Sequence, residues 1–242
     1  PTLQNMACYV AGRNFTWDEW SQINLQNEPY RPTCPQWPAH ASVIQSYTQF
    51  GENLARQGHV LEATSEFETI LALDPDWKLD QRNFEWLSAS TYANRLFGGE
   101  LEMRAKSFAF QGEISQAVDL FWQAKEYDPR LGFDPETIAG QLYAPKLVQE
   151  AESLAIQGEV EEAIARFTQA NEYDPSLGID AEARATELVP APITYGEEVT
   201  GTVTAGSGQS WVFEGRTGER ITIIQTDLGE SGLDTYLTLY GP

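Results

Sequence analysis

Three stretches in the middle of the chain repeat the same order of apolar and polar positions. Each stretch follows a Gln-Gly pair and ends at an Asp-Pro pair, and apolar or small residues recur within it at helical spacing. These residues are Val60, Ala63, Phe67 and Ile70 in the first stretch, Ile114, Ala117, Phe121 and Ala124 in the second, and Val160, Ala163, Phe167 and Ala170 in the third. The pattern predicts three amphipathic helices, each burying one face.

The residues that flank these stretches predict helical hairpins. Gly58, Gly112 and Gly158 precede them, and glycine takes the positive φ of a helix-ending turn at little cost. The Asp-Pro pairs stop each second helix, because proline disfavours helical backbone in the residue before it. We therefore expect three hairpins in a row. The first helix of the third hairpin is expected to run from about Pro135 to Gln157, and residues 76–97 to form an additional helix across the first two hairpins.

The amino-terminal region carries its own helix signal and the chain's two cysteines. Thr16 followed by Glu19 is a capping box that predicts a helix start, and the neighbouring tryptophans Trp17, Trp20 and Trp37 are expected to form a local core. Cys8 and Cys34 admit two interpretations: small residues that close a helical hairpin, with or without a disulfide, or a nucleophile with His40 as its base. We favour the first, since no third member of a catalytic triad or glycine-rich loop accompanies them.

The last fifty residues switch to an alternating pattern that is typical of strands. Strands are expected over residues 198–203, 210–215, 219–225 and 234–240, separated by glycine-containing turns. A small β-sandwich is the natural architecture for such a series. The composition shifts divide the chain into residues 1–43, a Trp- and Pro-rich helical linker, residues 44–189, the repeats, and residues 190–242, the strands. The predicted fold is therefore mainly α with a small carboxyl-terminal β-sandwich.

The charge of the chain narrows the classes of partner. A formal net charge of -21 and a pI near 4.3 argue against nucleic acid and against anionic membrane surfaces, and leave two alternatives, a basic protein or peptide partner or none. No apolar run approaches the roughly 20 residues of a membrane helix, and no secretion signal opens the sequence. With two histidines and two cysteines, neither a metal site nor a cofactor is expected.

The repeats resemble the tetratricopeptide repeat family in the lengthened form of cyanobacterial proteins. The run from Gln157 to Pro175 follows the second half of that motif, and Gly51, Ala105 and Ala151 stand at its small-residue position. The resemblance implies a helical-hairpin solenoid whose first helices line a groove for a protein or peptide. The implied groove residues are Gln45, Gln49, Glu52, Arg56, Glu102, Met103, Lys106, Phe110, Gln149, Glu152 and Ile156. The alternative is a groove that the chain's own flanking helix fills, or that is merely solvated.

Two further resemblances concern the ends of the chain. Residues 7–38, with Ala-Cys, Arg-Asn-Phe-Thr, Glu-Trp and Pro-Tyr-Arg-Pro-Thr-Cys-Pro, are similar to a tail of bacterial STAND ATPases, WD-repeat and caspase-like signalling proteins. Gly201, the Trp211-Val212-Phe213 run and the run 233–239 resemble part of the bacterial pre-peptidase carboxyl-terminal domain. These resemblances imply that the chain is one arm of a larger multidomain protein.

The favoured function is a non-catalytic scaffold module that binds a protein partner. The alternatives are a fragment of a hydrolase, caspase-like, protease or ATPase, whose catalytic domain lies outside this chain, and a structural subunit of an assembly. The first terminal resemblance favours the cytoplasm, and the second favours the periplasm or the extracellular space. The cytoplasm is preferred on the sequence alone.

Overall fold

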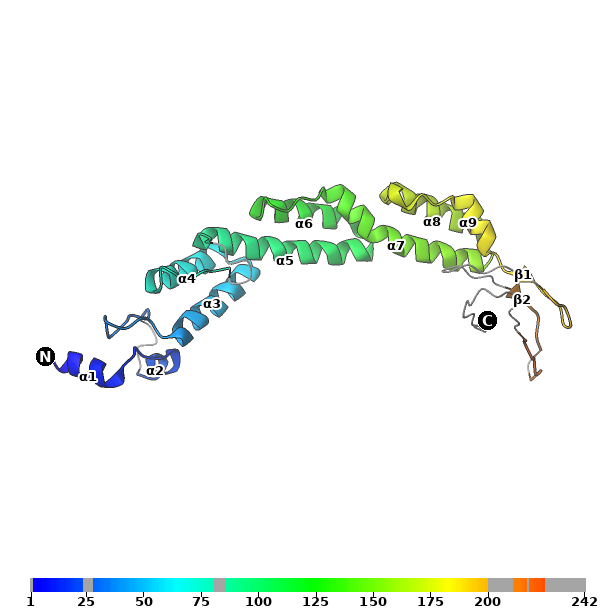
Figure 1. Cartoon of the computed structure of the whole chain (residues 1–242). Helices are drawn as coiled ribbons and strands as arrows, with labels where there is room; N and C mark the ends of the chain where they lie inside the picture. The colour runs from blue at the N-terminus through cyan, green and yellow to red at the C-terminus, as the bar shows by residue number, and fades with distance from the viewer. Residues whose placement is uncertain (1, 24–27, 81–85, 200–210, 217, 225–242) are drawn as a thin grey trace, which may run out of the picture. The chain divides into compact units, whose positions relative to one another are not determined.

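The computed structural model describes residues 2–23, 28–80, 86–199, 211–216 and 218–224, and most of them are helical (Figure 1). The helices are α1 (Leu3–Ala11), α2 (Trp17–Gln22), α3 (Ala41–Arg56), α4 (Val60–Leu73), α5 (Ala89–Gln111), α6 (Ile114–Tyr127), α7 (Pro135–Ile156), α8 (Val160–Tyr173) and α9 (Ala181–Leu188), with a 3-10 turn at Pro175–Leu177. The strands are β1 (Ala191–Pro192) and β2 (Trp211–Val212). The prediction of a mainly α chain is confirmed.

The chain forms two compact units, Pro1–Tyr143 (unit 1) and Ala144–Pro242 (unit 2), and the division falls inside α7. Unit 1 holds α1 to α6 and the start of α7. Unit 2 holds the rest of α7, together with α8, α9 and the two strands. The expected boundary after residue 43 falls just inside α3, because the side chain of His40 caps that helix by accepting a hydrogen bond from the Ser42 amide.

The three helical hairpins are present where the apolar pattern predicts them. Gly58, Gly112 and Gly158 take φ values of 88°, 90° and 85° in the turns that follow α3, α5 and α7. The predicted faces of α4, α6 and α8 are turned inward, with their central residues fully buried: Ala63 and Phe67, Ala117 and Phe121, and Ala163 and Phe167. The helix of the third hairpin that was expected over 135–157 is α7, which agrees to within one residue.

The starts of α5, α7 and α9 show a second sequence repeat, with a period of 46 residues. Their capping residues are Ser88, Asp134 and Asp180, each 46 residues from the next, and each side chain accepts a hydrogen bond from the amide three residues on. Ala93, Ala139 and Ala185, also 46 residues apart, are fully buried. Helix α9 is therefore equivalent to the first part of α7. It ends at Leu188 because Pro190 follows closely.

The additional helix expected over residues 76–97 is wrong in its extent. Residues 76–80 and 86–88 are not helical, residues 81–85 lie outside the described residues, and the helix that begins at Ala89 continues to Gln111 as α5. The Gly98-Gly99 pair does not interrupt this helix. Gly98 is buried against the end of α6, where its missing side chain allows close approach, so packing outweighs the low helix propensity of glycine.

In unit 1 the turn of each hairpin is covered by an aromatic residue of the next first helix. A Cβ added at Gly58 would lie 3.3 Å from the ring of Phe97, and one added at Gly112 would lie 2.9 Å from the ring of Tyr143. Phe97 also meets Tyr127 edge to face, with ring centroids 4.7 Å apart. These repeated contacts join successive hairpins along unit 1.

The amino-terminal segment packs against the first hairpin. Trp20 and Tyr30 are buried with Val43 of α3, and the two rings meet edge to face at 5.1 Å. The Trp17 amide donates to Ser42 Oγ at 3.0 Å, and the Trp17 ring meets Tyr47 at 5.4 Å. Trp17 and Trp20 thus belong to a local core, as expected, whereas Trp37 remains 40% exposed.

The carboxyl-terminal β-sandwich is not seen in the described residues. Strands β1 and β2 form one parallel pair in which Ala191 lies opposite Trp211 and Pro192 opposite Val212. Of the strand expected over 210–215, residues 211 and 212 are in a strand, residues 213–215 are not, and residue 210 lies outside the described residues. Residues 219–224 are not in a strand. Parts of two other expected strands lie outside the described residues, namely residues 200–203 and residue 225. The strand expected over 234–240 lies wholly outside them. So short a pair buries little: Trp211 and Val212 are 37% and 52% exposed.

Candidate functional site

The eleven groove residues implied by the repeat pattern lie on the first helices of the hairpins, α3, α5 and α7, and none of them is buried. The eight on α3 and α5 belong to unit 1, and Gln149, Glu152 and Ile156 belong to unit 2. Gln45, Gln49 and Arg56 on α3, Met103 and Phe110 on α5, and Gln149 and Ile156 on α7 are exposed; Glu52, Glu102, Lys106 and Glu152 are half-buried. The structure brings the eight of unit 1 into one compact unit.

Two of the eleven residues are engaged by the second helix after their own, α5 for Glu52 and α9 for Glu152. Glu52 accepts a hydrogen bond from the Tyr92 hydroxyl of α5 at 2.8 Å. Burial, and secondarily this bond to a carboxylate, raise the pKa of Tyr92 above its ordinary value. Glu152 accepts from Arg184 of α9 at 2.9 Å, beside an open hollow of about 450 Å³ in unit 2. At these two positions a later helix of the same chain contacts the groove residue, as expected if the chain's own helices fill the groove.

Helix α5 presents an apolar strip to solvent at its carboxyl-terminal half. Met103 and Phe110 are 55% and 56% exposed and lie seven residues apart, which places them on one face of the helix. Lys106 lies between them, and its Nζ is 2.7 Å from a carboxylate oxygen of Glu102, so the ammonium is neutralised within the helix. The opposite side of α5 is packed, with Leu101, Ala105 and Ala109 buried. We call Met103, Lys106 and Phe110 the α5 strip.

The first helices of unit 1 differ in charge from the second helices. Helices α3 and α5 carry Glu52, Glu100 and Glu102 against Arg56, Arg95, Arg104 and Lys106, so bases slightly outnumber acids. Helices α4 and α6 carry Glu62, Glu66, Glu68, Asp119 and Glu126 against Lys125. Among these four helices the acidic excess therefore lies on the second helices, α4 and α6. The α5 strip offers an apolar, charge-balanced surface rather than an acidic one.

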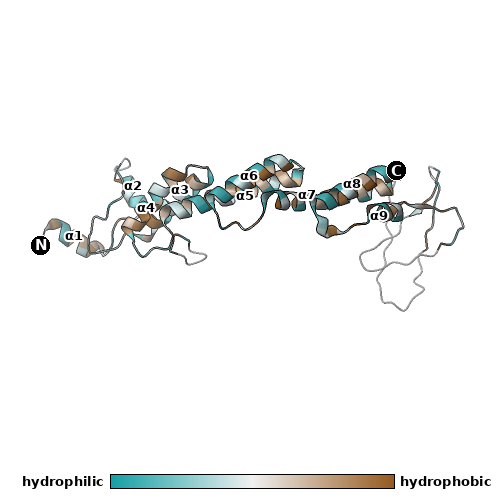
Figure 2. Cartoon of the chain, turned by 90° about the horizontal axis from the view of Figure 1, so that it is seen from above, coloured by the Kyte–Doolittle hydropathy of each residue, from teal (hydrophilic) through white to brown (hydrophobic). Residues whose placement is uncertain are grey.

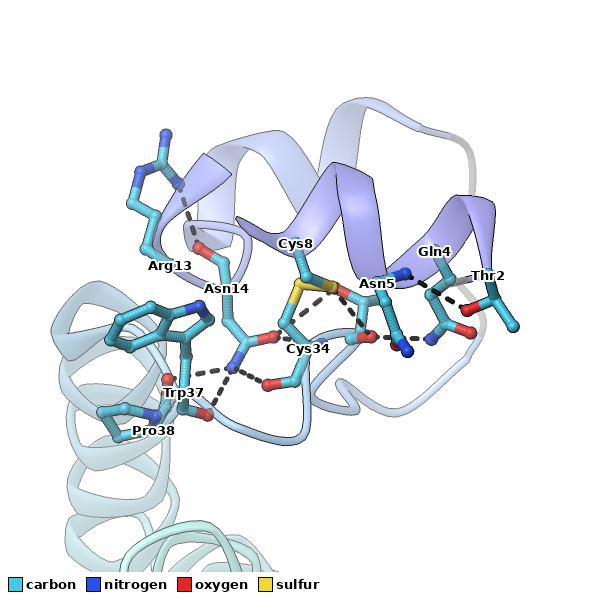
Figure 3. The surroundings of a disulfide bond; sticks show 10 residues. Thr2, Gln4, Asn5, Cys8, Arg13, Asn14, Cys34, Trp37 and Pro38 are labelled. Carbon is cyan, nitrogen blue, oxygen red and sulfur yellow. Dashed lines mark hydrogen bonds between the residues drawn. A yellow bond between two sulfur atoms is a disulfide. The ribbon is translucent and has the colours of Figure 1, made fainter. Parts of the chain in front are cut away.

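Cys8 and Cys34 are joined in a disulfide, with Cα atoms 5.5 Å apart (Figure 3). Neither sulfur is then available as a nucleophile, and His40 is instead the cap of α3. Both cysteines are buried. The pair therefore fits the interpretation in which the two cysteines hold a local structure together, and it does not fit a nucleophile with His40 as its base.

Beside the disulfide, the buried side chain of Asn14 fixes the loop that contains Cys34 (Figure 3). Its Nδ2 lies 3.2, 2.7 and 3.0 Å from the carbonyl oxygens of Cys34, Trp37 and Pro38. Its Oδ1 accepts from the Cys34 amide at 2.8 Å. One side chain thus contacts four backbone groups of a loop twenty or more residues away, and the two hydrogens of its amide are shared among three carbonyl oxygens. Sequence reasoning missed this role because an isolated asparagine does not reveal long-range partners.

The capping box predicted at Thr16 is present and is reinforced by Arg13. Thr16 Oγ1 accepts from the Glu19 amide at 3.2 Å, and the Glu19 carboxylate accepts from the Thr16 amide at 2.9 Å. The same carboxylate receives two bonds from the Arg13 guanidinium, at 2.7 and 2.8 Å. The Arg13 bonds and the Thr16 amide hold the pKa of Glu19 at about 2. This arrangement stabilises the start of α2.

Helix α1 is a second candidate surface, which sequence reasoning missed. Leu3, Met6 and Val10 are 88%, 58% and 87% exposed and lie at helical spacing on one face, and Tyr9 beside them is 85% exposed. Within α1, all of which the structure describes, Cys8 is the one buried residue. The signal was present in Thr2 as amino-terminal cap and Gly12 as carboxyl-terminal cap around this apolar spacing.

Comparison with protein-family models, with curated proteins and with solved structures gave no match for this chain. Among the described residues, no group of three or more His, Cys, Asp or Glu side chains is placed to hold a metal ion. No helix in the described ranges has the length and apolar character needed to span a bilayer. The candidate site is therefore defined by its own geometry, the α5 strip and its neighbours on the first helices.

Proposed function

We propose that this chain is a non-catalytic protein-interaction module, built as a tetratricopeptide-like solenoid, that binds a helical or extended peptide segment on its first helices. The observation that carries the proposal is the α5 strip, in which Met103 and Phe110 remain exposed on a helix whose other side is fully packed. Large exposed apolar side chains at i and i+7 form one apolar helix face, against which the apolar face of a partner segment can pack.

The distribution of charge over the helices changes the expected chemistry of the partner segment. A strongly basic peptide would be attracted to the acidic second helices, whereas the first helices of unit 1 are charge-balanced. The proposed partner segment is therefore apolar on its contact face and needs no basic residues there. The engagement of Glu52 by Tyr92 limits the proposed surface in unit 1 to the α5 strip and the exposed residues of α3.

A second candidate, a structural subunit of an assembly, is favoured by α1, whose apolar face has no covering element among the described residues. The compartment is also a proposal. Disulfides persist in oxidising surroundings, so the Cys8–Cys34 bond supports the periplasm or the extracellular space over the cytoplasm. The pre-peptidase resemblance points the same way.

Site-specific photo-crosslinking in the producing cells tests the proposed function. A photoreactive amino acid replaces Met103 in one variant and Leu61 in a matched control, since Leu61 is 84% exposed on the second helix α4. The proposal predicts a discrete crosslinked species from position 103 that position 61 does not give, and its loss when Phe110→Glu is added. No species at 103, or the same species at both positions, contradicts it.

A further inference from the structure

Helix α1 is held in helical form although it packs against no other helix or strand in the described residues. A nine-residue helix is not stable alone in water. Here Thr2 accepts a hydrogen bond from the Asn5 amide, Gly12 donates to the Cys8 carbonyl, and the disulfide fastens the helix to the loop at Cys34. Gln4 adds a hydrogen bond from its side chain to the Thr33 carbonyl at 2.9 Å. The chain therefore pre-organises a helix whose apolar side chains face solvent.

The exposed face of α1 has the same spacing as the α5 strip. Leu3, Met6 and Val10 follow the pattern i, i+3 and i+7, and so do Met103, Lys106 and Phe110. Each pair of outer residues spans about 10 Å along its helix axis, at about 1.5 Å per residue. Figure 2 colours residues of α1 at the hydrophobic end of the scale. Two exposed surfaces of matching length, neither covered by another described residue range of unit 1, thus occur in that unit.

The absence of charged residues from α1 favours it as the segment that contacts the α5 strip of another copy. Helix α1 contains no Asp, Glu, Lys, Arg or His, whereas the chain as a whole carries a formal charge of -21. Two copies of such a chain repel one another, so they approach best where one offers an uncharged surface and the other a charge-balanced one. Helix α1 offers an uncharged surface of this kind, and the α5 strip, with Lys106 paired to Glu102, offers a balanced one.

We propose that the α5 strip of one copy receives α1 of a second copy, in a reciprocal dimer with two such contacts. This inference rests on the proposed function, since it names the partner of the same surface. Pre-organisation of α1 reduces the ordering cost of docking. The contact made by one short helix is small, so two contacts per dimer are needed, and a weak dimer is expected, in the micromolar range or above.

Sedimentation of the full chain over about 1 µM to 1 mM, the range in which contacts of this size dissociate, tests the proposal. Met6→Lys disrupts α1 and Met103→Glu disrupts the α5 strip, and both positions are exposed, so folding is preserved. Each variant alone is expected to raise the dimer dissociation constant about tenfold or more, since each places a charge in an apolar contact. Leu61→Lys, on exposed α4, is the matched control and leaves the constant unchanged.

Mixing the two variants distinguishes this pairing from others. The mixture retains one unaltered contact and brings the introduced lysine of one variant and the introduced glutamate of the other, whose charges are opposite, into the same second contact, so it is expected to form a tighter dimer than either variant alone. Sodium chloride is expected to tighten the wild-type dimer, because salt screens repulsion between the two acidic chains. A wild-type chain that is monomeric throughout, a variant that dimerises like wild type, or a mixture no tighter than its components overturns the proposal.

The outcomes also separate this inference from the proposed function. A monomeric wild-type chain whose position 103 still crosslinks to a different protein overturns the second-copy partner and leaves the binding surface intact. A monomeric chain with no crosslink at position 103 overturns both. A crosslinked species composed of two copies of this chain supports both.

Discussion

Gly98 of α5 faces Asp128 at the end of α6 so closely that a Cβ on Gly98 would lie 3.3 Å from the Asp128 Cβ. The same Cβ would lie 3.1 Å from the carbonyl oxygen of Ala124 and 3.3 Å from the Asp128 amide nitrogen. The adjacent Gly99 has nothing within 4 Å of its added Cβ. The two glycines of one helix therefore have opposite surroundings, one in contact with backbone and one open.

Alanine substitutions at these two positions are expected to change stability in opposite directions. Gly99→Ala gains the helix propensity of alanine and raises the free energy of unfolding by about 0.5–1 kcal/mol. Gly98→Ala gains the same propensity, but backbone atoms of α6 cannot move aside cheaply, so it lowers that free energy by about 1 kcal/mol. Urea unfolding of both variants measures the difference. Equal stabilisation by both would contradict the close packing of α5 on α6.

Asn14→Ala is expected to lower the free energy of unfolding of the amino-terminal segment by about 2–4 kcal/mol. The substitution leaves the buried Cys34 amide and three backbone carbonyl groups without this partner. Asn53→Ala, at an exposed position of α3, is the control and changes stability by less than about 0.5 kcal/mol. Thermal unfolding followed by tryptophan fluorescence compares the two. Similar effects for both variants would show that Asn14 does not hold the loop.

Replacement of both cysteines, Cys8→Ser with Cys34→Ser, is expected to release α1 and leave the hairpins folded. Helix α1 is attached through the disulfide and the bond from Gln4, whereas Asn14 holds the 33–38 loop independently. Hydrogen exchange should therefore speed up in residues 3–11 and stay unchanged in α3 to α6. Protection of α1 in the double variant, or loss of protection throughout unit 1, would rule out this local role.

Glu19 is expected to make the stability of the amino-terminal segment depend on pH in the acid range. Its pKa is lowered from 4.5 to about 2 in the folded chain, so its contribution is fully present above about pH 4.5 and is lost as the pH falls toward 2. Glu19→Gln removes the contribution. The difference in melting temperature between wild type and variant should be largest near neutral pH and shrink below pH 4.5. A difference that does not change with pH would exclude the pairing with Arg13.

The local signals of the repeats were sufficient to predict the hairpins. Residues such as Ala63 and Phe67 recur at helical spacing, and Gly58 marks the turn, so periodicity alone located α4, α6 and α8. The length of α5 was not predictable in this way. Whether Gly98 and Gly99 end a helix depends on a contact with α6, and tertiary contacts do not appear in a local pattern.

The candidate site was predicted only in part. The resemblance to the repeat family placed Met103 and Phe110 among the groove residues, but it could not show that Tyr92 and Arg184 would engage Glu52 and Glu152, because those contacts join segments more than thirty residues apart. The strands were expected from alternation alone. Alternation defines a strand only where neighbouring strands cover it, and β1 and β2 have two residues each.

The central claim is that the α5 strip is a contact surface, and the two methionines of the chain test it most directly. Met6 lies on α1 and Met103 on the α5 strip, so protein labelled at the methionine methyl groups gives one NMR signal for each surface. Substitution of each methionine by leucine assigns the two signals. The account predicts that dilution shifts both signals together, with one midpoint. A Met103 signal that stays unchanged from the highest concentration to the lowest, while the chain still associates, would contradict the account.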